Sequence, residues 1–166
     1  HAGCLIVRDG LLGSVEPYRV RPADYAGPAR WETGTPQIEL LAGIAAAAEF
    51  MLETPVAEEV ERETRLLALL QEGLHEVPRV TVHGPSVSPD RAPTVIFTVE
   101  GFSPAQVDEF LAERRIAVWH GDNYACELVD ALGLRESGGL IRAGIVRYTS
   151  EDDIAALLAA LTELTS

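Results

Sequence analysis

Residues 31–36, Trp-Glu-Thr-Gly-Thr-Pro, have the residue types that bind an anion at the start of a helix. Gly34 lets the backbone come close to a ligand, Thr35 is a favourable N-cap, and Pro36 suits the first helical position. The free N–H groups of that helix start would then face a phosphate. The same residues would also form an ordinary capped helix that binds nothing, and spacing alone favours this second interpretation.

Arg142 is a second candidate, because it lies in a predicted strand with apolar residues on both sides. Burying an unpaired guanidinium is very costly, so a buried Arg142 requires a carboxylate or phosphate partner. Its planar fork suits a carboxylate held by two hydrogen bonds. The chain has 26 acidic residues, so the residues alone favour a structural ion pair over a ligand.

The predicted strand at residues 116–119 is followed by a cluster of polar residues: His120, Asp122, Asn123 and Tyr124. Folds that alternate helices and strands place binding sites at strand ends, but no partner for these side chains is evident in the sequence. His120 suits either a general acid–base role or a turn, and the turn is favoured. Cys126, near a predicted helix start, suits a reactive thiol or a packing role, and packing is favoured.

The composition excludes several classes of function. A formal charge of −13 argues against a nucleic-acid or anionic-membrane surface, and no apolar run reaches the roughly 18 residues of a membrane span. The chain's two cysteines form no metal-spaced pair and no disulfide framework, so we expect a cytoplasmic protein without a metal site. All 13 basic residues are arginine, and the chain has no lysine.

Hydrophobic periodicity and capping residues predict the elements. A strand is expected at residues 3–8, and a helix at 36–52 that is apolar nearly all round and therefore buried on several sides. From residue 56 the order is helix, strand, strand, helix, strand, helix, strand, helix. This order predicts an α/β fold class, as a two-layer α+β domain with a small, mostly antiparallel sheet and helices on one face. The predicted ranges after residue 56 are 56–76, 79–83, 93–99, a helix capped at Ser103, 116–119, 124–132, 140–148 and a helix capped at Ser150.

Five stretches in order resemble the C-terminal part of the class V aminotransferase family, the fold-type I pyridoxal-phosphate enzymes that include cysteine desulfurases. The closest likeness is to its desulfurase-like subgroup of uncertain chemistry. The stretches are residues 1–8, 18–22, 31–36, 116–125 and 139–148. The resemblance implies that residues 1–52 are the C-terminal remnant of a pyridoxal-phosphate-binding large domain. Residues 53–166 would be the small C-terminal domain.

The resemblance also implies site residues. Gly34 and Thr35 would bind the phosphate of the pyridoxal 5'-phosphate cofactor, in this family usually that of the neighbouring subunit, so we expect a homodimer. Arg142 would hold the α-carboxylate of an amino-acid substrate, and Asn123 and Tyr124 would lie at the same substrate site. For Arg142, the likeness shifts the interpretation from an ion pair to a ligand.

Two departures from the family limit what this chain does alone. The Schiff-base lysine is absent and is expected a few residues before His1, so this chain contains no catalytic residue and is expected to be inactive alone. Tyr124 stands where desulfurases have their persulfide cysteine, and Cys126 would point to another helix face. Transamination, epimerisation and β-elimination remain open, with cysteine desulfuration as an alternative. A non-catalytic α+β binding or regulatory module is the alternative from another class.

Overall fold

The computed structural model describes residues 3–8, 10–20, 27–32 and 34–166. The chain divides into two compact units, His1–Thr54 and Pro55–Ser166. That the first is the remnant of a large domain and the second a small domain stays a prediction.

The described residues of the first unit form three short to medium helical elements. They are α1 (Leu11–Ser14), the 3-10 helix η1 (Gly27–Trp31) and α2 (Ile38–Leu52). The strand predicted at residues 3–8 is wrong, because no strand is found among the described residues of this unit and an isolated extended segment has no ladder to join.

Helix α2 differs from its prediction at its start and in its burial. It begins at Ile38 with Gln37 as N-cap and without a side-chain capping hydrogen bond, so the prediction of Thr35 as N-cap is wrong. The tight turn in which the Ile38 N–H donates to the Pro36 carbonyl (3.1 Å) delays the helix. No residue of α2 is buried, and Phe50 is 59% exposed. The expected burial of α2 on several sides is therefore wrong for this structure.

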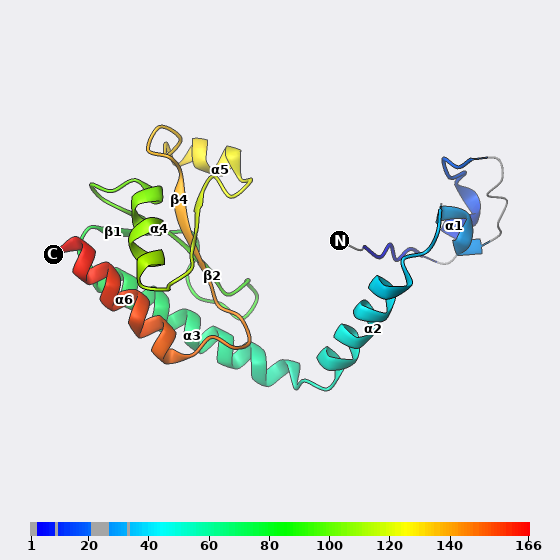
Figure 1. Ribbon diagram of the computed structural model, residues 1–166, viewed down its shortest axis with the longest axis horizontal. Helices are drawn as coiled ribbons and strands as arrows, with labels where there is room; N and C mark the ends of the chain where they lie inside the picture. The colour runs from blue at the N-terminus through cyan, green and yellow to red at the C-terminus, as the bar shows by residue number, and fades with distance from the viewer. Residues whose placement is uncertain (1–2, 9, 21–26, 33) are drawn as a thin grey trace. The chain divides into compact units, whose positions relative to one another are not determined.

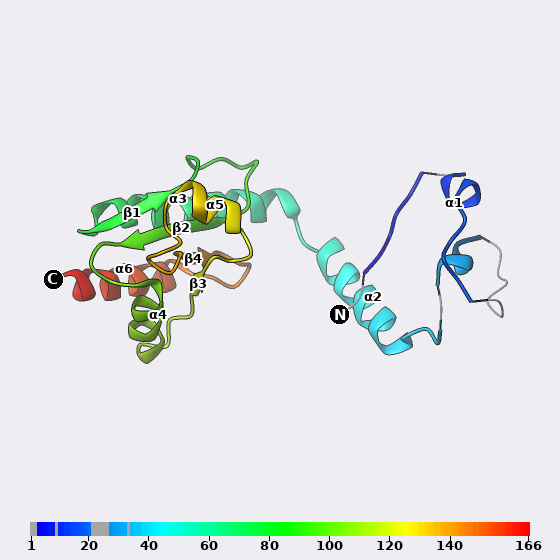
Figure 2. The same ribbon diagram turned by 90° about the horizontal axis from the view of Figure 1, so that it is seen from above.

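The second unit is a four-stranded antiparallel sheet covered mainly on one face by helices, which confirms the predicted fold class. Figure 1 shows α3 and α6 below the strands and α5 above them, and Figure 2 shows the strands side by side. The strand order is β1-β2-β4-β3. The elements are α3 (Val56–Glu76), β1 (Val80–His83), β2 (Thr94–Val99), α4 (Pro104–Glu113), β3 (Trp119–Gly121), α5 (Cys126–Ala131), β4 (Leu140–Gly144) and α6 (Glu151–Thr165).

Local sequence explains where the helices of this unit begin. In α4 the Ser103 hydroxyl accepts from the Gln106 N–H while the Gln106 side chain accepts from the Ser103 N–H. Ser150 and Asp153 form the same reciprocal pair at α6. Each pair satisfies two amides that the helix itself leaves unpaired, so both predicted starts are confirmed.

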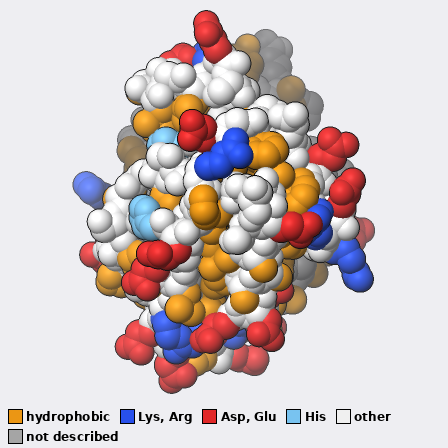
Figure 3. Space-filling view, turned by 90° about the vertical axis from the view of Figure 1, so that its left-hand side faces the viewer, with side chains coloured by type: hydrophobic (Ala, Val, Ile, Leu, Met, Phe, Trp, Pro, Cys, Tyr) orange, Lys and Arg blue, Asp and Glu red, His pale blue; other side chains and the backbone are white. Residues whose placement is uncertain are grey.

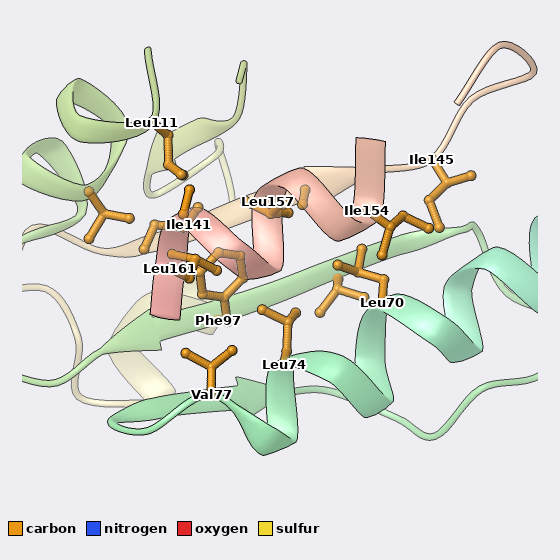
Figure 4. Packing of buried hydrophobic residues seen from close by; sticks show 14 of the residues in the cluster. Leu70, Leu74, Val77, Phe97, Leu111, Ile141, Ile145, Ile154, Leu157 and Leu161 are labelled. Atoms are coloured by element: carbon orange, nitrogen blue, oxygen red, sulfur yellow. The ribbon is translucent and has the colours of Figure 1, made fainter. Parts of the chain in front are cut away.

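The core lies between the sheet and helices α3, α4 and α6. Strand β2 alternates, so that Val95, Phe97 and Val99 are buried while the residues between them are only half-buried. Figure 4 shows Phe97 among Leu74 of α3 and Leu161 of α6. We refer to this side as the core face of the sheet and to the opposite side as the outer face.

The middle of the unit departs from the predicted ranges. Strand β3 covers Trp119–Gly121 instead of 116–119, and α5 begins at Cys126 instead of at residue 124. Asn123 and Tyr124 both have left-handed backbones, with φ of 52° and 59°. Left-handed residues cannot continue into a right-handed helix, which is why α5 starts after them. Strand β4 ends at Gly144, four residues earlier than predicted.

Charge on the surface follows the acidic composition. On the face drawn in Figure 3, acidic side chains gather along the lower rim, hydrophobic side chains occupy the middle, and basic side chains stand singly or in small groups. This face therefore offers no concentrated basic surface. Within the described ranges, no single helix is long and apolar enough to cross a membrane.

Candidate functional site

A single row of residues crosses the outer face of the sheet, with one residue from each strand. The register pairs Trp119 with Arg142, Arg142 with Ile96, and Ile96 with His83. Directly paired residues in antiparallel strands point to the same side. We call this set the outer row: Trp119, Arg142, Ile96 and His83.

Arg142 stands on the outer face because its strand neighbours Ile141 and Ala143 point into the core. Its side chain is exposed, so the premise that it is buried among apolar residues is wrong: strand alternation separates it from them. Among the residues that the structure describes, none forms an ion pair with it, and the structural ion pair favoured by the residues alone is absent. A cation without a protein partner is available to an anionic ligand.

Beside Arg142, the outer face is hollowed. A cavity of about 500 Å³ extends from Ile96 and Thr94 to the end of β1 and is closed on one side by α5. Its apolar walls include Leu128 and Leu132. The remaining lining residues are His83, Gly84, Pro85, Arg91 and Ala92. Arg142 itself does not line the cavity, but Ile96 is both its cross-strand partner and a lining residue, so the cavity begins one strand away from Arg142 on the same face.

Two polar side chains of the cavity already have partners. The ring nitrogen Nε2 of His83 lies 3.0 Å from the Thr98 hydroxyl, and burial lowers the pKa of His83. The Arg91 guanidinium donates to the carbonyls of Pro85 and Thr94, the latter at 2.6 Å. The lowered pKa of His83 favours its neutral form, and Arg91 is held by backbone oxygens. Arg142 is therefore the exposed cation of the outer row.

Asn123 and Tyr124, predicted at the substrate site, lie beyond the end of the β3–β4 ladder. The ladder runs from the Trp119–Arg142 pair to the Gly121–Leu140 pair, and both residues follow Gly121. Tyr124 is 94% exposed, while the Asn123 amide donates to the Gly121 carbonyl at 3.2 Å. The structure therefore does not bring them into the outer row beside Arg142, and their role in substrate binding stays a prediction.

Asp122 organises this loop. Its carboxylate accepts from the Tyr124 N–H at 3.0 Å and from the Cys126 thiol at 3.3 Å, and these two bonds, the first the larger, lower the pKa of Asp122. Cys126 is half-buried at the first position of α5. The thiol thus serves as a hydrogen-bond donor that holds the loop to the helix.

His120 points to the core face, because its cross-strand partner is Ile141. Its Nδ1 lies 3.2 Å from the Asp108 carboxylate on α4. The histidine that the sequence offered as a turn residue or an acid–base group is a strand residue tied to a helix on the other side from Arg142.

The Gly34–Thr35 segment belongs to the first unit and retains features of an anion site. Gly34 has a left-handed backbone (φ 87°) with open space where a side chain would be. Thr35 is exposed, and the first turn of α2 lacks a side-chain cap, although its first N–H, that of Ile38, donates to the Pro36 carbonyl. The segment fits a phosphate group, although Glu39 in that first turn would weaken its hold.

Sequence reasoning missed Trp119, Ile96 and His83. Only the strand register brings them beside Arg142, and no local pattern in the sequence encodes that register. Alternation in β2 would have identified Ile96 as an outer-face residue. In the described part of the chain, no group of three or more potential ligands could hold a metal ion.

Comparison with known proteins covers nearly the whole chain. A probable cysteine desulfurase from Halobacterium salinarum is 28% identical over 172 residues, which is 97% of this chain and 40% of that protein. The apo structure of a cysteine desulfurase from Thermococcus onnurineus NA1 is similar with a TM-score of 0.76 and 31% identity, over 83% of this chain and 34% of that one.

A third match shows likeness in fold. The solved protein C-DES, in a variant with glycine covalently linked to its pyridoxal-phosphate cofactor, has a TM-score of 0.71 and 24% identity over 95% of this chain and 40% of that one. This chain therefore spans about 40% of the length of relatives such as the Halobacterium protein. The model of the family called Aminotransferase class-V matches residues 3–157, and the chain belongs to that family.

Proposed function

We propose that this chain is the C-terminal part of a pyridoxal-phosphate-dependent enzyme that acts on an amino acid, with Arg142 as the anchor of the substrate carboxylate. The observation that carries the proposal is the exposed Arg142 guanidinium in the middle of the outer row, which has no ion-pair partner among the described residues. A planar fork that is fixed by a strand and free of protein partners is suited to a carboxylate.

The cofactor is proposed from family membership and from the fit of the first unit. Thr35 and the Gly34 backbone would hold its phosphate beside the uncapped first turn of α2. Bound pyridoxal phosphate supplies an electron sink for reactions at the amino-acid α-carbon. The chain has no lysine, so the covalent attachment would come from another part of the protein. A homodimer, in which Thr35 contacts the neighbouring subunit's cofactor, extends the proposal.

Cysteine desulfuration is the second candidate, favoured by the names of the relatives and by the thiol of Cys126 near the sheet edge. Against it, the Cys126 thiol donates to Asp122 and the fully exposed side chain of the loop is Tyr124. We therefore place desulfuration below a reaction that needs no cysteine nucleophile.

The test uses the intact protein with pyridoxal phosphate. Borohydride reduction followed by mass measurement should give one pyridoxyl group per chain. Amino-acid binding, followed by the change in cofactor absorbance, should weaken about 100-fold in Arg142→Gln, because two charge-assisted hydrogen bonds are lost. Arg142→Lys should recover part of the loss.

Arg65→Gln is the matched control, since Arg65 is an exposed arginine on α3, on the core-face side, and its Nε lies 3.8 Å from the Glu151 carboxylate, at the long end for an ion pair. It should bind amino acids like the wild type. Absence of a pyridoxyl adduct in the intact protein would favour the non-catalytic module, and an Arg142→Gln variant with wild-type affinity would refute the role of Arg142. Cysteine desulfuration would be favoured if the wild-type protein releases sulfur from free cysteine and the Cys126→Ser variant does not.

A further inference from the structure

The cavity beside Arg142 has a composition that distinguishes among amino acids. Its walls are mostly hydrocarbon: Ile96 from β2, Leu128 from α5, and Leu132, the residue that follows α5 as its C-cap. Its volume of about 500 Å³ lies within the range of cavities that bind small molecules. The outer face therefore offers two regions of different chemistry: the cation of Arg142 and, across Ile96, an apolar cavity.

We propose that this cavity receives the substrate side chain, so that the substrate is an α-amino acid with a sizeable apolar side chain. The inference rests on the proposed function, because it requires the carboxylate to be bound at Arg142. The continuity between the two regions is Ile96, which pairs with Arg142 across β2 and β4 and also lines the cavity. A carboxylate on Arg142 places the rest of the molecule over Ile96.

The polar groups of the cavity do not call for a charged side chain. The His83 ring is paired with Thr98, and its burial favours the neutral form. The Arg91 guanidinium donates through both terminal nitrogens to backbone carbonyls of its own loop, including that of Ser86 at 3.3 Å. An acidic side chain would therefore find donors already engaged, whereas an apolar one displaces water from leucine and isoleucine surfaces.

The experiment compares dissociation constants for L-alanine, L-leucine and L-aspartate on the intact, cofactor-loaded protein, from absorbance titrations. Burial of each added methylene strengthens binding by up to about fourfold, so leucine should bind at least about tenfold more tightly than alanine. Aspartate should bind no more tightly than alanine. Equal constants for alanine and leucine, or a preference for aspartate, would overturn the inference.

Ala92→Phe fills the cavity from an exposed lining position. It should reduce the advantage of leucine over alanine to under about threefold. Ala105→Phe, at an exposed position on α4 against the core face, is the matched control and should keep the advantage. Should Ala92→Phe fail to fold, Leu132→Ser is the second test, and it should also reduce the advantage of leucine over alanine. The Leu132 side chain is 38% exposed and can be made polar without opening the core.

The Arg142→Gln variant separates the two levels of the argument. Suppose that Arg142→Gln loses binding of all three amino acids, while the wild type binds alanine and leucine with equal dissociation constants. This result would refute the proposal that the cavity receives the side chain and would leave Arg142 as the carboxylate anchor. Unchanged binding in Arg142→Gln refutes both.

Discussion

Trp119 lies directly opposite Arg142 in the pairing of β3 with β4, on the outer face of the sheet. The indole is 55% exposed, so burial in the core is not what holds it there. Its position next to an unpaired guanidinium is the basis of the first prediction.

Trp119→Ala should weaken amino-acid binding about threefold to tenfold, because loss of the indole admits water to the bond between Arg142 and a carboxylate. The free energy of unfolding should change by less than about 0.5 kcal/mol, as expected for substitution of an exposed side chain. Tyr148→Ala, which removes an 88% exposed aromatic ring outside the row, is the control and should affect neither quantity. A large stability loss in Trp119→Ala would indicate a structural role instead.

Gly139→Ala should disrupt the placement of β3 against β4. A Cβ on Gly139 would collide with the Gly121 carbonyl and lie 3.0 Å from the Asp122 amide, and the backbone φ of 94° is unfavourable for alanine. We expect a loss of about 2–4 kcal/mol in the free energy of unfolding, measured with urea. Gly133→Ala has a similar φ of 69° but open space, so its loss should be about 1 kcal/mol. Equal losses would mean that backbone strain, not the close approach, dominates.

Phe97→Ala should destabilise the protein by about 3–5 kcal/mol, because it leaves a large cavity at the centre of the core. The ring is fully buried between the sheet and helices α3 and α6 (Figure 4). Trp119→Ala serves as the matched aromatic deletion on the opposite face. Similar urea midpoints for the two variants would contradict the assignment of the core face.

The capping box of α6 should be sensitive to acid. Hydrogen bonds from the Ser150 hydroxyl, first, and the Ser150 N–H lower the pKa of Asp153 below its ordinary 3.8. A lowered folded-state pKa stabilises the fold above the ordinary pKa, and this contribution is lost as pH falls through the folded value. The stability difference between wild type and Asp153→Asn should therefore be present at pH 6 and should shrink progressively as the pH falls below the ordinary carboxyl pKa of 3.8.

Two further variants check that prediction. Ser150→Ala should cost about 1 kcal/mol at pH 6, as expected for a lost N-cap. Asp152→Asn, which keeps both capping hydrogen bonds, should retain the wild-type loss of stability in acid. A difference between wild type and Asp153→Asn that stays constant from pH 6 into strong acid would contradict the capping role.

Local sequence was sufficient for the elements whose cause is local. The pairs Ser103–Gln106 and Ser150–Asp153 predicted where α4 and α6 begin, because each capping interaction spans only three residues. The element order after residue 56 predicted the two-layer fold. Family membership followed from motifs read in order along the chain and was confirmed by the family model.

Two positions near helix starts were predicted wrongly, because the local backbone conformation does not follow from residue type alone. Thr35 was predicted as an N-cap from its residue type, but the turn at Pro36 moved the helix start to Ile38. Tyr124 was placed in a helix, yet its left-handed backbone, with the Asp122 carboxylate accepting from its N–H, keeps it outside α5.

Arg142 illustrates most clearly what the sequence determines and what only the tertiary structure decides. The sequence determined its type and its apolar neighbours, which suggested a buried charge in need of a partner. Only the tertiary structure decided which face it occupies, since the helices cover the side to which Ile141 and Ala143 point. The strand register then placed Trp119 and Ile96 beside it, although Trp119 is 23 and Ile96 is 46 positions from Arg142 in sequence.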